Sequence, residues 1–278
     1  MKLKTQLIAV FTFAGLIVAC SGHQPNAPVH STSALKPQTR AQLDRKRYDT
    51  PSPTLAGQST VQGILQTYGE RVKGKFNYYF SKAKVSYPPR EVILVALKQE
   101  KKLELWAKDR GEFRFIRDYY IMAASGVAGP KLRQGDRQVP EGIYRITEMN
   151  PNSHYHLSMK IDYPNEFDLF HAGQEGRTNP GADIFIHGKA ASIGCLAMGD
   201  EAIEELFVLT AQVGAENVKV VIAPHDPRTY PLKVASEKLP EWTPALYSMI
   251  SREIAALSPV VQKSAKPGIA LTPPINFQ

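Results

Sequence analysis

The apolar residues between positions 91 and 223 fall in short runs that are typical of β-strands. The runs are rich in Val, Ile, Leu and aromatic residues, and loops with Gly, Pro and Asn separate them. They cover residues 91–98, 102–108, 113–121, 142–147, 156–162, 183–187 and 218–223. The pattern predicts a β-rich core, and the surrounding stretch of about 200 residues is long enough to bury one.

Three other segments place apolar residues three and four positions apart, which predicts amphipathic helices. The first begins at Val61, the second covers residues 200–213, and the third follows Thr243. Asp200 is the expected N-cap of the second helix. Thr243 is the expected N-cap of the third, with Pro244 at its first helical position. Helices and strands together predict an α+β fold.

The first twenty residues have the order of a secretory signal, with basic residues, an apolar stretch over 7–18, and then Ala19 and Cys20. The apolar stretch has twelve residues, too few for a membrane-spanning helix. Residues 17–20 resemble a bacterial lipobox, in which the cysteine is lipidated, and Ser21 after it points to the outer membrane in enteric-type bacteria. The alternative is a plain signal peptide with an incidental cysteine. Both interpretations predict a protein outside the cytoplasm, in the periplasm.

The composition changes sharply on either side of the predicted core. Residues 20–56 are rich in Pro, Ser, Thr, Gln and Asn without apolar periodicity, which predicts a disordered tether. The expected organisation is a signal peptide over 1–19, the tether over 20–56, an N-terminal helical segment over 57–89, a main domain over 90–258, and a Pro-rich tail over 259–278.

The charge of the chain is moderately basic. Removal of residues 1–19, which contain two lysines, lowers the formal net charge from +8 to +6. This charge suits an anionic polymer such as the cell wall, whose stem peptides carry carboxylates. Nucleic acid is excluded as a partner, because secretion removes the chain from it and no basic cluster alternates with aromatic residues. A lipid anchor would be the only link to a membrane.

The strongest chemical signal is the run HGKAASIGCLA, from His187 to Ala197. Seven residues separate His187 from Cys195, a spacing that lets the chain loop back and bring thiol and imidazole together. With Cys20 lipidated, Cys195 has no partner for an internal disulfide, and an unpaired thiol in an oxidising compartment indicates a chemical role. The pattern predicts nucleophilic acyl transfer. The alternative is a buried cysteine and a core histidine with structural roles only.

Glycines on both sides of the loop support the chemical interpretation. Gly188 lets the chain turn after the strand that ends at His187. Gly194 permits a conformation in which its own amide and that of Cys195 face a developing oxyanion. A metal site is not expected, because the spacing of His154, His156 and His171 matches no compact ligand set.

At the level of families, the segment IFIHGKAASIGCLAM (184–198) resembles the active-site signature of the L,D-transpeptidase catalytic domain, the YkuD family. Residues 129–147, 150–168 and 200–207 are similar to its YafK-like subgroup. The resemblance covers about residues 90–260. It implies a single α+β, β-rich catalytic domain, a mixed β-sandwich or barrel with flanking helices.

The resemblance also implies a mechanism. Cys195 would be the nucleophile and His187 its base, oriented by a backbone carbonyl or a hydroxyl of residues 188–192, including Ser192. The thiol would attack the third-position diaminopimelate carbonyl of a peptidoglycan stem peptide and form a thioester. An amine of another stem, a lysine of a wall-attached lipoprotein, or water would then take the acyl group. No metal or organic cofactor is required.

Other residues carry weaker signals. Lys131 and Arg137 flank a loop that could receive stem-peptide carboxylates, although both could be solvated charges. The family places Tyr163, Asn165 and Asp168 near the cleft, where Tyr163 and Asn165 are candidate substrate-binding residues. Hydrogen bonding within their own loop is the alternative.

Two positions depart from the broad family, which affects the expected activity. Ile193 stands where many members have a second histidine, and Ala197 where they have arginine, so the substrate preference is open. Besides a transpeptidase, the sequence allows a hydrolase of the same fold that cuts diaminopimelate-linked bonds or releases a lipoprotein. It also allows a wall-binding lipoprotein without activity.

Overall fold

A computed structural model of the chain describes residues 59–257. The predicted signal peptide, Cys20, the whole of the tether and the Pro-rich tail lie outside these residues. Within them, no helix combines the length and the apolar character needed to cross a membrane.

Nine strands form one mixed sheet in the part of the chain that the structure describes, in the order β3-β2-β1-β9-β5-β6-β7-β8-β4. Strands β1 and β9 are parallel, as are β7 and β8, and the other pairs are antiparallel. The strands are β1 (Glu91–Leu97), β2 (Lys102–Lys108), β3 (Arg114–Tyr120), β4 (Ala123–Ala124), β5 (Gly142–Ser153), β6 (His156–Ile161), β7 (Phe185–His187), β8 (Leu196–Ala197) and β9 (Val218–Ala223).

The middle of the sheet is covered on both faces, which explains the continuous apolar runs. In β1, Leu94 belongs to one buried cluster, while Ile93 and Val95 belong to another. Successive side chains of a strand point to opposite faces, so a strand covered on both sides needs apolar residues at every position. This arrangement accounts for the sequence EVILVAL.

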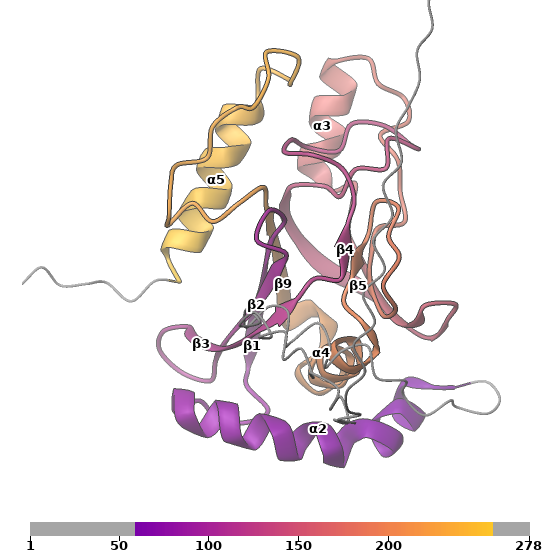
Figure 1. Cartoon of the computed structure of the whole chain (residues 1–278), viewed down its shortest axis with the longest axis vertical. Helices are drawn as coiled ribbons and strands as arrows, with labels where there is room; N and C mark the ends of the chain where they lie inside the picture. The colour runs from indigo at the N-terminus through magenta and orange to yellow at the C-terminus, as the bar shows by residue number, and fades with distance from the viewer. Residues whose placement is uncertain (1–58, 258–278) are drawn as a thin grey trace, which may run out of the picture. The chain divides into compact units, whose positions relative to one another are not determined.

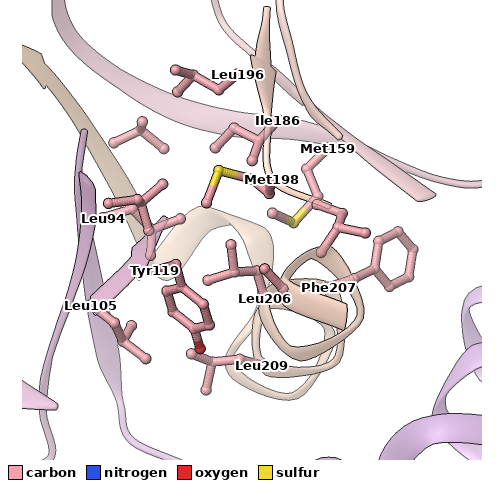
Figure 2. Packing of buried hydrophobic residues seen from close by; sticks show 14 of the residues in the cluster. Leu94, Leu105, Tyr119, Met159, Ile186, Leu196, Met198, Leu206, Phe207 and Leu209 are labelled. Carbon is pink, nitrogen blue, oxygen red and sulfur yellow. The ribbon is translucent and has the colours of Figure 1, made fainter. Parts of the chain in front are cut away.

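Four α-helices are described, namely α2 (Val61–Ala83), α3 (Glu166–Gln174), α4 (Asp200–Val213) and α5 (Thr243–Ala255), with a 3₁₀ turn η1 (Ala215–Asn217). Helices α2 and α4 pack together against one face of the sheet, and α5 covers the other near β9 (Figure 1). Leu206, Phe207 and Leu209 of α4 meet side chains of β1, β2 and β7 in the larger cluster (Figure 2). The fold is α+β with a mixed sheet, as the sequence predicts.

The helix boundaries correct two expected caps. Gly199 precedes α4, and Asp200 is its first residue; the Asp200 carboxylate instead accepts a hydrogen bond from the Lys189 amide at 2.8 Å. Trp242 precedes α5, so Thr243 lies inside the helix and not at the cap. Asp200 therefore connects α4 to the loop that carries the candidate chemistry.

Candidate active site

Two short parallel strands bring the predicted nucleophile and base to the same face of the sheet. In their register, Ile186 of β7 pairs with Leu196 of β8, and His187 pairs with Ala197. Cys195 lies two positions before Ala197, so its side chain points to the same face as that of His187. The two residues are therefore diagonal neighbours across the strand pair.

Both side chains line one pocket of about 270 Å³. Two larger pockets, of about 650 and 550 Å³, lie elsewhere and contain no cysteine or histidine. We regard the smaller one as the candidate site because it holds the reactive groups. Its lining residues are Asn150, Asn152, Ser153, His154, Tyr155, Ser158, Phe185, His187 and Cys195.

A backbone carbonyl orients the imidazole of His187. Its Nδ1 lies 2.6 Å from the carbonyl oxygen of Gly188, within the 188–192 segment expected to orient the ring. A carbonyl can only accept, so Nδ1 carries the proton and the lone pair is on Nε2. The residue as a whole is only 3 % exposed. His187 is thus held in the tautomer that a general base requires.

The electrostatics favour a neutral pair in the resting state. Burial lowers the pKa of His187, although its bond to Gly188 opposes the effect. Burial also raises the pKa of the Cys195 thiol, and the Phe185 amide and the charge of Lys131 only partly offset this. Both shifts disfavour charged groups in a desolvated site. Neither shift favours a preformed ion pair of thiolate and imidazolium, and the thiol's hydrogen-bond partner is the Asp183 carbonyl, 3.9 Å from Sγ.

The two amides expected to stabilise an oxyanion already have partners. Gly194 has a φ of 101°, as its predicted role requires, but its N–H donates to Ser125 Oγ at 2.6 Å. The Cys195 N–H donates to Ser192 Oγ at 3.0 Å, and that hydroxyl donates back to the Cys195 carbonyl at 2.5 Å. An oxyanion would have to displace these hydroxyls. Ser192 therefore contacts the backbone of Cys195, and no bond to His187 is described.

The basic residues near the site differ in their surroundings. Lys131 is buried, and its ammonium group bonds to Asp136 at 2.5 Å and to the Arg133 carbonyl at 2.9 Å. Because these bonds occupy Lys131, it organises its loop and is not free to receive a substrate carboxylate. Arg137 is exposed and adopts a φ of 56°, and its role in substrate binding stays a prediction.

Tyr163 and Asn165 do not line the pocket at Cys195. The buried Tyr163 hydroxyl donates to the Pro180 carbonyl at 2.7 Å. Asn165 caps α3, accepts from the Phe167 amide at 3.0 Å, and forms a capping box with Asp168. Asn165 does line the 550 Å³ pocket, away from the thiol. Both side chains therefore follow the alternative of hydrogen bonding within their own region.

Most of the pocket wall comes from residues that the sequence did not single out. They belong to the tip of the β5–β6 hairpin, residues 150–156, called the hairpin tip below. The Tyr155 ring lies 4.4 Å from that of His187, measured between centroids, at an interplanar angle of 40°. The only available signal was the family resemblance over residues 150–168, because nothing local marks a hairpin tip as part of a distant site.

The three histidines considered for metal binding lie in different settings. His156 bonds to Glu204 at 2.7 Å, and His171 stacks on Trp242 with ring centroids 4.5 Å apart. His154 borders the candidate pocket. Among residues 59–257 no group of three or more potential ligands is placed to hold a metal ion.

Comparison with known proteins shows what this domain is similar to. Residues 90–222 match the family model of the L,D-transpeptidase catalytic domain, YkuD. A protein named "Putative L,D-transpeptidase YafK" from Escherichia coli K12 is 38% identical over 138 residues, which cover 48% of this chain and 54% of that protein. Its counterpart in Escherichia coli O157:H7 matches to the same extent. The match spans about half the length of these curated relatives.

Among solved structures, the helical cell shape determining protein Pgp2 from Campylobacter jejuni is similar, with 18% identity and a TM-score of 0.41. The alignment covers 66% of this chain and 77% of that one. L,D-transpeptidase 1 from Mycobacterium tuberculosis aligns over 48% of this chain and 62% of its own, with 11% identity and a TM-score of 0.29.

Proposed function

We propose that this protein is a peptidoglycan-modifying L,D-transpeptidase that works through a thioester on Cys195. The observation that carries the proposal is the common pocket of Cys195 and His187, whose side chains point to one face of a parallel strand pair. The tautomer of His187 supports it, because the free lone pair on Nε2 is the one that accepts a thiol proton. The match of residues 90–222 to the YkuD family model supports the substrate class.

Acylation follows from these groups. Nε2 of His187 takes the thiol proton while Sγ of Cys195 bonds to the third-position diaminopimelate carbonyl of a stem peptide. The bond between this carbonyl and the terminal D-alanine nitrogen then breaks, and His187 returns the proton to the leaving amine. Two easier steps replace one difficult amide exchange, which is the advantage of covalent catalysis.

Deacylation uses the same base. An amine of a second stem, or a lysine of a wall-attached lipoprotein, attacks the thioester carbonyl and forms a new amide. The carbon–sulfur bond breaks, and the amine proton passes through His187 to the sulfur. A water molecule in place of the amine would give the free acid, the outcome of a hydrolase.

The test is a reaction of the purified protein with tetrapeptide muropeptides, followed by mass spectrometry of the products. We expect loss of D-alanine together with formation of crosslinked dimers, and a thioester adduct on Cys195. Cys195→Ala should abolish all three. Loss of D-alanine with gain of water alone would instead identify a hydrolase, and an unreactive Cys195 would identify a wall-binding protein without activity.

We also propose a periplasmic location with a lipid on Cys20 that tethers the protein to the outer membrane. The lipobox-like residues 17–20 and Ser21 support this location. Such a tether would hold the catalytic domain beside the cell wall, where stem peptides and wall-attached lipoproteins occur together.

A further inference from the structure

The side chain of Tyr155 forms a cover over the candidate base. Its ring contacts that of His187 at 4.4 Å between centroids, while Tyr155 itself remains 44 % exposed. One side of the ring therefore shields the imidazole of His187, a residue that is 3 % exposed, and the other side faces solvent. Tyr155 stands at the boundary between the reactive pair and water.

The backbone of Tyr155 is also packed against residues 188–194, the loop between His187 and Cys195, called the catalytic loop below. A Cβ atom placed on Gly188 would lie 2.6 Å from the Tyr155 carbonyl oxygen, so the two chains meet with no room for a side chain. The Tyr155 amide donates to Ser153 Oγ at 3.1 Å, which shapes the turn around it. Tyr155 is thus held directly over the segment that orients His187.

The hairpin tip is held from three separate directions. Asn152 accepts from the Ser59 amide and donates to the Ser59 carbonyl, both at 2.7 Å. Lys189 of the catalytic loop donates to the His154 carbonyl at 2.6 Å. His156 bonds to Glu204 of α4 at 2.7 Å. These contacts keep the Tyr155 ring in place before any substrate binds, so its cover is preorganised.

The cover matters most for the thioester. Water needs only space and a base to hydrolyse it, whereas a large amine acceptor brings binding contacts of its own along the open rim of the pocket. Exclusion of water from a closed site is a recognised way to suppress such a side reaction. The Tyr155 ring covers one side of the base, so water reaches the thioester through the open rim of the pocket, where a bound acceptor occupies the same space.

We propose that Tyr155 selects the acyl acceptor, so that an amine and not water receives the diaminopimelate acyl group from Cys195. This inference rests on the proposed transpeptidase function. In the favoured path the acceptor nitrogen forms the amide, the carbon–sulfur bond breaks, and the amine proton reaches the sulfur through His187. In the path that Tyr155 suppresses, a water oxygen bonds to the acyl carbon and forms the free acid. The carbon–sulfur bond breaks, and a proton of the water reaches the sulfur through His187.

The experiment measures how the acyl-enzyme divides between the two products. Wild-type protein, Tyr155→Ala, Tyr155→Phe and Tyr155→Leu react with tetrapeptide muropeptides, and dimer and hydrolysed tripeptide are quantified by mass spectrometry. Tyr230→Ala is the matched control, because Tyr230 is 42 % exposed and stacks on His225 at 3.9 Å, yet does not line the Cys195 pocket. Circular dichroism verifies that each variant is folded.

An aromatic contact is worth about 0.5–1.5 kcal/mol, which corresponds to a two- to about tenfold change in a rate ratio. We therefore expect the ratio of hydrolysis to transfer to rise by two- to about tenfold in Tyr155→Ala, and less in Tyr155→Leu. Tyr155→Phe keeps the ring and should match the wild type, as should Tyr230→Ala. If Tyr155→Ala does not fold, the comparison of Tyr155→Leu with Tyr155→Phe decides.

The possible results separate the inference from the function on which it rests. No acyl-enzyme in the wild type, or a wild type that yields only hydrolysis, refutes the proposed transpeptidase function itself. A wild type that forms dimers, together with a ratio of hydrolysis to transfer that is the same in all Tyr155 variants, overturns acceptor selection alone.

Discussion

Replacement of Gly188 by alanine tests whether the packing around His187 is as close as the structure shows. The new Cβ would lie 2.6 Å from the Tyr155 carbonyl oxygen, 2.7 Å from Asp200 Oδ1 and 3.1 Å from a methyl group of Ile203. Two of these atoms are held in place, since one is backbone and the Asp200 carboxylate accepts the Lys189 amide. The chain must therefore move, and with it the carbonyl that orients His187.

The expected cost follows from overpacking of a filled site. Such substitutions destabilise by about 1–3 kcal/mol. For a folded unit of about 200 residues, each kcal/mol lowers the unfolding temperature by about 2–4 °C. Gly188→Ala should therefore melt about 2–12 °C below the wild type. Displacement of the Gly188 carbonyl should also slow acylation of Cys195, because His187 loses its orienting bond.

The matched control is Gly74→Ala in α2. This glycine is exposed in the middle of a helix, and a Cβ there meets nothing within 4 Å. Alanine stabilises such a position by about 0.5–1 kcal/mol. Thermal unfolding followed by circular dichroism, with the rate of thioester formation on the same samples, measures both effects. A Gly188→Ala protein with wild-type melting and wild-type acylation would refute the close packing described above.

Three further predictions concern other parts of the molecule. Lys131→Gln should raise the pKa of Cys195, because the charge of Lys131 lowers it, and the midpoint of iodoacetamide alkylation against pH should move upward. Burial raises the pKa of Asp168 from 3.8 to about 7, so the folded state binds the proton more tightly, and stability should fall as pH rises through this interval. Urea unfolding of Asp168→Asn should lack this decline, and an unchanged pH dependence would contradict the assignment. Cys20→Ala should abolish labelling by radioactive palmitate and move the protein from the membrane to the soluble periplasmic fraction; continued membrane association would count against the anchor.

Long apolar strands were predictable from sequence, because burial on both faces leaves a continuous signal. The runs at 102–108 and 218–223 have the same bounds as β2 and β9. The two-residue strands β4 and β8 were not predicted, since two positions show no period. Helix α3 was missed because only Asp168 and Ala172 are buried in it, so no apolar stripe marks it.

In the candidate site, too, the features that depend on local sequence could be predicted, and those that depend on long-range contacts could not. His187, Gly188 and Cys195 could be singled out because their chemistry and spacing are local. The contacts that complete the site join residues far apart in the chain, such as Ser125 with Gly194 and Tyr155 with His187. No local pattern encodes these contacts, because they depend on the sheet order that places β6 and β4 beside the short parallel pair.

The parallel pairing of β7 and β8 gives the glycines of the motif a role beyond substrate access. A parallel connection usually needs a dozen or more residues, yet only eight lie between His187 and Leu196. Such a short connection requires a tight turn directly after β7 and another directly before β8. Gly188 allows the first turn, where the chain passes close to the Tyr155 carbonyl. Gly194 allows the second turn, with a φ of 101°. A variant that keeps both reactive side chains but lacks either glycine should therefore separate thiol from imidazole, since the register that aligns them depends on this loop.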